Sequence, residues 1–273
     1  MRRRRRPCND GILVTDAFYL PDDHRFVPQE WTRGPWDPRF QHAGPPSALM
    51  GRAIERLEGG EEFAVSRITV EILRSVPLAP LDLEAELLRP GRRVQLAEAT
   101  LSDADGIVAI ARAWRIRVGD VSAIATLDDA PAFRSPEESA VSPAYDPWNG
   151  PSYFSAVEWR LAAGTFLDPG PATAWMRMRI PLLPSEEPSP LSRVLVAADS
   201  GNGISQVVPI DKFLFMNTEL SVHLHRMPAG EWVCLDARTR IGAEGVGLAT
   251  SDIYDERGRI GSGNQSLLVS RSE

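Results

Sequence analysis

The stretch LSRVLVAADSGNG, from Leu191 to Gly203, sets a single carboxylate, Asp199, in a run of apolar residues. At helical spacing Leu195 and Val196 lie one turn before this acid and on the same side. The pattern therefore predicts an apolar helix with Asp199 at its middle, ended by the two glycines of the GNG triplet. Removing a carboxylate from water is costly, so this acid should be hydrogen-bonded or take part in chemistry.

A second helix of this kind is predicted earlier in the chain, after the Pro- and Gly-rich approach WTRGPWDPRFQHAGPP (31–46). Pro45 and Pro46 suit the first turn of a helix, where a missing N–H leaves no bond unmade. Apolar residues cover most of the surface from Ala48 to Leu57, and Gly59 follows as a stop signal. A helix with so little polar surface has to be enclosed by another layer.

Each helix is followed by four segments that are typical of strands. After the first helix they are SRITVEILR (66–74), LDLEAELLR (81–89), RVQLAEATLSD (93–103) and IVAIARAWRIR (107–117). After the second they are FLFMNTELSVHLHR (213–226), EWVCLDARTR (231–240), VGLATSDIYD (246–255) and RIGSGNQSLLVSR (259–271). Short links between such strands predict an antiparallel meander. The expected class is α+β, with a curved sheet around each helix.

The order of these elements repeats at a nearly constant offset. Arg74 ends the first strand after the first helix, and Arg226 ends the corresponding strand 152 residues later. The turn glycines Gly106 and Gly258 are also 152 residues apart. An offset kept through helix, strands and turns indicates an internal duplication rather than two unrelated meanders.

The duplication divides the chain into two domains. We expect them at 1–117 and 151–273, joined by a linker at 118–150 in which Ala, Ser, Asp and Pro replace the periodic pattern. Residues 1–10 are expected to be a disordered tail. Their arginine run, Arg2 to Arg6, precedes an apolar run that is too short for a secretion signal, so the expected location is cytoplasmic.

Composition argues against several kinds of partner. The net charge of −7 argues against nucleic acid or an acidic membrane surface. No segment approaches the ~18–20 apolar residues that span a bilayer. Two cysteines are too few for a disulfide scaffold, and the four histidines lack metal-binding spacing. The sequence also shows neither a GxSxG elbow at a strand–helix junction nor a nucleotide-binding glycine motif. We therefore expect no metal and no cofactor.

The two halves differ where chemistry is expected. Ser47 lies 152 residues before Asp199, so the first half lacks the acid. Alternation along the last strand places Gln265 on the inward face, and its counterpart is Ala113. A buried amide needs hydrogen-bond partners, for which Asp199 and a water are available. A carboxylate that accepts a proton, with an amide that orients a water, is what hydrolysis of a reactive acyl compound requires.

Several short motifs, in their order and spacing, resemble the double-hotdog acyl-CoA thioesterases, the thioesterase II-like group, over about residues 30–271. The motifs are FQHAGPPSALMGRAI, ILRSVP, ELLRPGR, AADSGNG, SVHLHRMP and IGSGNQSLLVSR. The resemblance implies a double hotdog, two tandem curved antiparallel sheets each wrapped around a central helix. It also implies a cytoplasmic hydrolase of lipid metabolism that acts on acyl-CoA and assembles as a homodimer or higher homo-oligomer.

The resemblance also implies site residues. In this family an Asp on the second hotdog helix, a Thr on the next strand and a Gln on the last strand activate water against the thioester. Asp199 and Gln265 match the first and last of these. Aligning on the His-Arg pair at 225–226 puts Asn217 at the Thr position, whereas strand alternation puts the neighbouring Thr218 on the apolar face. The third residue is therefore either Asn217 or Thr218.

A loop before the first helix completes the expected site. His42, Ala43 and Gly44 resemble the family's glycine-bearing loop, whose backbone N–H groups could polarise the thioester carbonyl. One alternative function is a double hotdog that binds acyl chains or acyl-CoA without turnover. A hydratase-like hotdog enzyme is less favoured, because it needs a histidine beside the acid and the DSGNGIS stretch has none. Release of free thiol from acyl-CoA distinguishes hydrolysis from both.

Overall fold

A computed structural model of the chain describes residues 16–126, 130–142, 147–166, 168–209 and 212–271. The tail expected to be disordered, residues 1–10 with its arginine run, lies outside the described residues. Within them no helix is long and apolar enough to cross a membrane.

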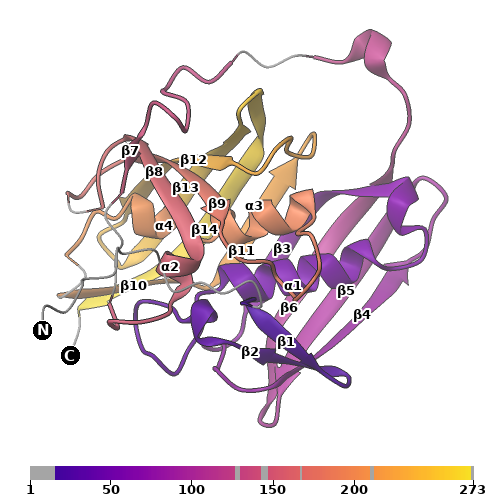
Figure 1. Cartoon of the computed structure of the whole chain (residues 1–273), viewed down its shortest axis with the longest axis horizontal. Helices are drawn as coiled ribbons and strands as arrows, with labels where there is room; N and C mark the ends of the chain where they lie inside the picture. The colour runs from indigo at the N-terminus through magenta and orange to yellow at the C-terminus, as the bar shows by residue number, and fades with distance from the viewer. Residues whose placement is uncertain (1–15, 127–129, 143–146, 167, 210–211, 272–273) are drawn as a thin grey trace, which may run out of the picture.

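All 14 strands of the described residues join one antiparallel sheet, which carries two main helices (Figure 1). In sheet order the strands are β1 (Tyr19–Asp22), β2 (Arg25–Pro28), β4 (Leu81–Arg89), β5 (Val94–Asp103), β6 (Gly106–Arg117), β3 (Phe63–Ile72), β11 (Glu219–Leu224), β14 (Gly258–Arg271), β13 (Val246–Asp255), β12 (Val233–Ile241), β9 (Ala172–Met178), β8 (Val157–Ala163) and β7 (Ala140–Val141), while β10 (Phe213–Asn217) also pairs with β14. The helices are α1 (Gly44–Glu55), α2 (Tyr153–Ala156), α3 (Pro190–Ala198) and α4 (Gly201–Ile204), with short 3-10 turns at Glu30–Thr32, Gly60–Glu62 and Ser122–Ile124.

The two longer helices are covered on most of their surface, as their apolar sequences predict. Nine of the 12 residues of α1 and seven of the nine residues of α3 are buried. Helix α1 packs against β4 and β5, and α3 packs against β9 and β12. The two helices also pack against each other in opposite directions, since Gly44 approaches Val196 while Ser189 donates a hydrogen bond to Glu55 at 2.6 Å.

The centre of the sheet has the symmetry that the predicted duplication implies. Strands β3 and β11, which correspond at the 152-residue offset, pair with each other in antiparallel register. Thr69 and Ser221 are opposite one another there, and their hydroxyl oxygens are 3.0 Å apart. These two residues are themselves 152 apart, so an internal twofold axis passes between them. On either side of this axis the strand order is the same: β6, β5, β4 and β2 on one side, and β14, β13, β12 and β9 on the other.

In both halves an arginine after one strand makes equivalent hydrogen bonds to the turn between two other strands. In the first half the Arg74 guanidinium binds the Asp103 carboxylate and, at 3.0 Å, the carbonyl of the turn glycine at 106. In the second half Arg226 binds Asp255 at 2.8 Å and the carbonyl of the turn glycine at 258 at 3.1 Å. The duplication therefore extends to individual side-chain contacts.

Part of the segment predicted as a linker, 118–150, belongs to the second half of the sheet. Strand β7 pairs with β8, and the Phe133 ring packs edge-on against Trp175 and Tyr254. The Trp175 indole N–H also donates to the Arg134 carbonyl at 2.9 Å. A two-residue strand and one aromatic anchor produce no periodic pattern, so the sequence alone indicated only a linker.

A substitution at Gly44 tests the close approach of the two helices, because a Cβ at this position would lie 2.5 Å from the Val196 carbonyl oxygen. We expect Gly44→Ala to lower the free energy of unfolding by ~1–3 kcal/mol, the usual cost of overpacking. Gly203→Ala is the matched control, since a Cβ there meets nothing within 4 Å. Urea unfolding of both variants measures the difference, and equal midpoints would contradict this packing.

Candidate active site

Asp199 lies at a joint between α3 and α4, so the prediction of one continuous helix over 191–203 is wrong at its centre. The Ser200 N–H bonds three residues back to the Ala197 carbonyl at 2.9 Å. The Val196 carbonyl accepts instead from the buried Tyr153 hydroxyl at 2.6 Å. The Tyr153 hydroxyl therefore occupies the carbonyl to which the Ser200 N–H would bond in a regular helix. The helix ends one residue before the acid.

The Gln265 side chain bridges this joint. Its Nε2 donates to the Asp199 backbone carbonyl at 3.0 Å and to Oδ1 of the same residue at 3.2 Å. Its Oε1 accepts from the Asn202 N–H at 2.9 Å. The Gln265 amide thus bonds to backbone groups that would bond to each other's helical neighbours in an unbroken helix, and it uses both of its hydrogens. Gln265 is 2% exposed, so its predicted inward direction is confirmed, but it lies behind the carboxylate and does not line the cavity described below.

The structure brings Asn217 to the acid and leaves Thr218 away from it. The Asn217 Nδ2 donates to Asp199 Oδ1 at 2.9 Å. The exposed Thr218 hydroxyl donates to the Ser266 carbonyl at 3.3 Å. Of the two residues that the sequence left open, Asn217 therefore has the geometry of a third site residue.

A bulge explains why strand alternation favoured Thr218. Strand β14 pairs with β10 in one register and with β11 in a register shifted by one residue, because Thr218 is extra between the two strands. Such a slip exchanges the faces of all residues on one side of it. The first half has an equivalent bulge at Ser66, whose hydroxyl also donates to a carbonyl of the neighbouring strand, that of Trp114, at 3.2 Å. The bulge is thus a feature of the repeat.

The other carboxylate oxygen of Asp199 faces the start of α1. Oδ2 lies 3.0 Å from Nδ1 of His42, and the backbone N–H groups of Ala43 and Gly44 also act on the carboxylate. The Gly44 N–H is shared, because it donates to His42 Nδ1 at 3.1 Å. Free N–H groups and the dipole at a helix N-terminus favour a negative charge there. The loop expected to face a thioester carbonyl therefore faces the acid of the other half.

The sequence placed His42 at the site through the backbone of its loop, but the role of its side chain was missed. The expectation that no histidine lies near the acid considered only neighbours in sequence, and the 3.0 Å contact shows that it was wrong. The duplication contains the signal. Gly44 and Val196 occupy equivalent positions, 152 residues apart, and they touch where the two helices cross. Residues close to one of them in sequence, such as His42, are therefore candidates for contact with residues close to the other, such as Asp199. The His42 ring is also stacked 3.7 Å from the ring of Tyr153.

Burial controls the protonation of this pair. It raises the pKa of Asp199 to about 7, against the opposing effect of hydrogen bonds from Asn217, Ala43, Gln265 and Gly44. It lowers the pKa of His42 to about 3, so the imidazole is neutral at physiological pH. An uncharged neighbour gives the carboxylate no ion pair, and Asp199 can therefore gain or lose a proton near neutral pH.

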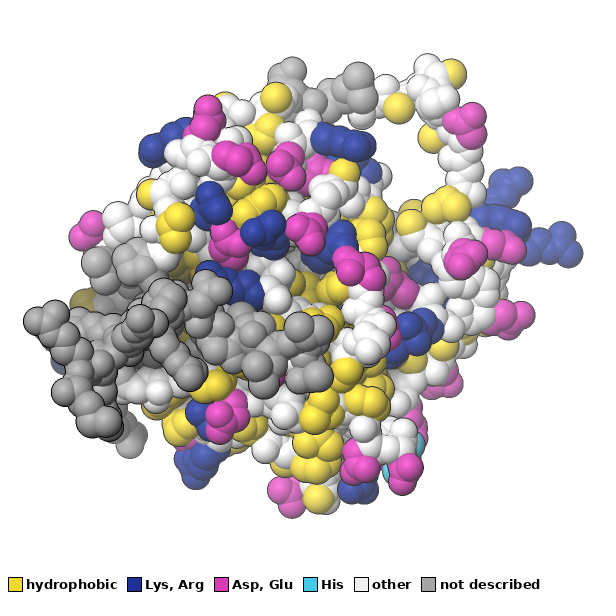
Figure 2. Space-filling view, viewed as in Figure 1, with side chains coloured by type: hydrophobic (Ala, Val, Ile, Leu, Met, Phe, Trp, Pro, Cys, Tyr) yellow, Lys and Arg dark blue, Asp and Glu magenta, His cyan; other side chains and the backbone are white. Residues whose placement is uncertain are grey.

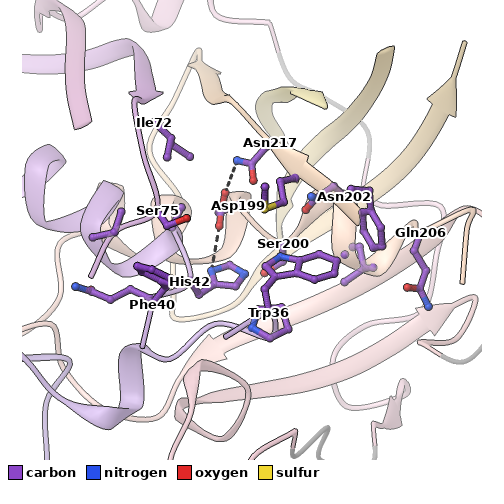
Figure 3. Close-up of a pocket in the computed structure, with 18 of the residues that line it drawn as sticks. Trp36, Phe40, His42, Ile72, Ser75, Asp199, Ser200, Asn202, Gln206 and Asn217 are labelled. Atoms are coloured by element: carbon purple, nitrogen blue, oxygen red, sulfur yellow. Dashed lines mark hydrogen bonds and ion pairs between the residues drawn. The ribbon is translucent and has the colours of Figure 1, made fainter. Parts of the chain in front are cut away.

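A cavity of about 790 Å³ opens onto the carboxylate and is lined by both halves of the chain (Figure 3). In Figure 3 Asp199 lies between Asn217 and His42, and Ser200 and Asn202 lie to the right of Asp199. The remaining lining is mostly apolar and includes Trp36, Phe40, Ile72, Val76, Phe154, Trp159, Phe166, Ile204, Phe215 and Met216. An apolar cavity with a few converging polar groups is the usual form of a small-molecule site. In the described part of the chain no three His, Cys, Asp or Glu side chains are grouped as metal ligands would be.

The corresponding place in the first half is filled with small and apolar side chains. Ser47 and Ala113 stand where the second half has Asp199 and Gln265, and both are fully buried. The Ser47 hydroxyl is used within its own helix, where it donates to the Ala43 carbonyl at 2.7 Å. This half therefore offers no second proton acceptor of the same kind.

The fold and this cavity are those of a hotdog-class protein with a small-molecule site, and comparison with protein families gives the family itself. The model of the acyl-CoA thioesterase N-terminal domain matches residues 32–116, and that of the acyl-CoA thioesterase C-terminal domain matches residues 136–269. The chain belongs to the acyl-CoA thioesterase family and is a thioester hydrolase.

Solved structures agree on the fold. A putative thioesterase II from Thermobifida fusca aligns with a TM-score of 0.72 at 14% identity, covering 94% of this chain and 96% of that one. A hotdog-fold protein of unknown function from Alicyclobacillus acidocaldarius aligns with a TM-score of 0.71 at 17% identity, covering 95% and 98%. The tesB protein of Mycobacterium avium subsp. paratuberculosis gives 0.66 at 18%, covering 90% and 92%. The search of curated proteins returned no match.

Proposed function

We propose that this chain hydrolyses acyl-CoA at the carboxylate of Asp199 and releases CoA and a carboxylic acid. The observation that carries the proposal is this buried carboxylate, which is held by donors from both halves at the polar end of an apolar cavity. We further propose a double hotdog that acts in lipid metabolism in the cytoplasm. Its two halves are residues 1–117 and 151–273, with β7 and Phe133 of the intervening segment packed on the second half. Arg and acidic side chains alternate over the face in Figure 2, which supports the absence of a nucleic-acid partner.

In the proposed reaction Asp199 takes a proton from a water as that water attacks the thioester carbon. The carbon–sulfur bond then breaks, and the thiolate of CoA leaves and takes up the proton from Asp199, which regenerates the carboxylate. Asn217 lines the cavity, and its Nδ2 donates to Asp199 Oδ1 and, at 3.3 Å, to the Glu219 carbonyl. Its own Oδ1 is therefore the atom that is placed to accept a hydrogen from the water. The N–H groups of Ala43 and Gly44 hold the carboxylate rather than the thioester oxygen in this arrangement.

Gln265 is assigned as a positioning residue. Both of its amide hydrogens bond to Asp199, so neither is left for the attacking water. Its contribution is to fix the carboxylate at the helix joint. Thr218 lines the cavity but has its hydroxyl on a backbone carbonyl, and it receives no role.

The contact between His42 and Asp199 is the one observation that favours a second function, hydration of an enoyl-CoA. Hydration adds water across a double bond and keeps the thioester, whereas hydrolysis liberates a thiol. Incubation with a saturated and an unsaturated acyl-CoA of equal length separates the two. Hydrolysis predicts thiol from both, and loss of the double bond without thiol would favour the hydratase.

Asp199→Asn should lower kcat/KM for an acyl-CoA by ~10²-fold or more, as expected for the loss of a general base. Ser47→Ala is the matched control, because it alters the repeat-equivalent position and should change kcat by less than ~3-fold. Thiol release measures both variants, and near-UV circular dichroism checks that they are folded. Equal rates for Asp199→Asn and the parent would show that the acid has only a structural role.

We also propose that the chain forms a homodimer or a higher homo-oligomer. Ile116 in the first half is 47% exposed, and Leu248 in the second half is 44% exposed. Leu268, 152 residues after Ile116, is 49% exposed and also lines the cavity. Large apolar side chains repeated on the surface of both halves favour an interface between copies. Light scattering at micromolar concentration should give at least twice the 30.0 kDa of one chain, and a monomer mass would exclude the assembly.

A further inference from the structure

Aromatic rings are concentrated around the cavity. The chain has 9 Phe, 7 Trp and 4 Tyr among 273 residues, and six of these rings line this one site. Long aliphatic side chains, which would suit a flexible acyl chain equally well, form the smaller part of the lining. The composition of the walls therefore carries information about the acyl group.

Four rings form a continuous wall that begins at the carboxylate. His42, whose Nδ1 is 3.0 Å from Asp199, meets Phe154 edge-on at 6.2 Å between centroids. Phe154 is stacked on Trp159 at 6.1 Å, and Trp159 meets Phe166 edge-on at 5.3 Å. We call these four residues, His42, Phe154, Trp159 and Phe166, the aromatic wall. A group bound beside the reacting carbon lies against rings in several orientations.

The wall is rigid on the side away from the cavity. The Trp159 indole N–H donates to the Phe154 carbonyl at 3.0 Å, and only 6% of Trp159 is exposed. Behind His42 the fully buried Tyr153 is fixed by its bond to the Val196 carbonyl. These hydrogen bonds fix the Trp159 ring and the ring behind His42, so this part of the wall favours a ligand that fits its shape and ring geometry.

The openings of the cavity limit how the thioester can bind. Trp36, on another part of the lining, is 38% exposed, and the lining residues Gly203 and Pro209 are exposed as well, so the cavity is open to water in more than one place. The phosphates of CoA need solvent, and we place the carrier at the Trp36 side. The acyl group then extends from Asp199 along the aromatic wall.

We infer that the preferred acyl group carries a flat aromatic ring, which packs offset or edge-on against Phe154 and Trp159. This inference rests on the proposed function. An aromatic pair is more favourable than its buried area alone accounts for, because the ring edge of one partner meets the face of the other. A saturated ring of similar size fills the same space but lacks this term.

The test compares three substrates with equal numbers of acyl carbons: phenylacetyl-CoA, cyclohexylacetyl-CoA and octanoyl-CoA. We expect kcat/KM for phenylacetyl-CoA to exceed that for cyclohexylacetyl-CoA by ~3- to 10-fold, the factor that one aromatic pair contributes. Octanoyl-CoA should be slower than phenylacetyl-CoA. A phenyl-to-cyclohexyl ratio of one or less, or a preference for the linear chain, would overturn the inference.

Two variants test whether the preference for the phenyl group depends on the aromatic wall. Phe154→Leu should bring the phenyl-to-cyclohexyl ratio close to one, and a ratio kept at the parent value would contradict the inference. Phe133→Leu is the control, because this ring packs on Trp175 and Tyr254 outside the cavity lining and should leave the ratio unchanged.

Failure of the inference and failure of the proposed function give different results. Hydrolysis that depends on Asp199 but shows no ring preference overturns only the aromatic acyl group. Hydrolysis that is unaffected in Asp199→Asn overturns the proposed chemistry at this site. If none of the three thioesters is hydrolysed, both fall.

Discussion

The structure depends on how one buried carboxylate is kept in place. Asp199 sits where the end of α3 meets the start of α1, and neither half alone supplies its partners. Asn217 and Gln265 come from the second half, whereas the N–H groups of Ala43 and Gly44 come from the first. This meeting requires the helices to approach so closely that only glycine fits at position 44. The duplication supplies the geometry, because the helices cross near the internal twofold axis.

The two halves use the same framework differently. In the second half the helix breaks at the acid, and the Gln265 amide takes over bonds that a regular helix would make with itself. In the first half the equivalent positions hold Ser47 and Ala113, and α1 continues unbroken through Ser47. A helix break exposes backbone groups that need partners, so it persists only where a suitable side chain faces it. The inward amide and the broken helix therefore occur together.

Features that depend on local spacing were predictable, and those that depend on distant partners were not. The repeat offset, the meanders and the inward direction of Gln265 followed from periodicity. The break after Ala198 did not, because the side chains that hold it open, Tyr153 and Gln265, are 43 and 66 residues from the carbonyl groups to which they donate. The choice between Asn217 and Thr218 required a bulge that alternation cannot show. His42 reaches the acid only through the packing of two helices.

The most direct test of the central claim, that Asp199 is the base, is the pH dependence of kcat/KM for an acyl-CoA. Burial raises the pKa of Asp199 to about 7, and the base acts only when deprotonated. Activity should therefore be constant above that pH and fall about tenfold per unit below it. The pKa of His42, about 3, lies too low to add an inflection in this range. Residual activity of Asp199→Asn should lack the inflection near pH 7, and its persistence in that variant would contradict the account.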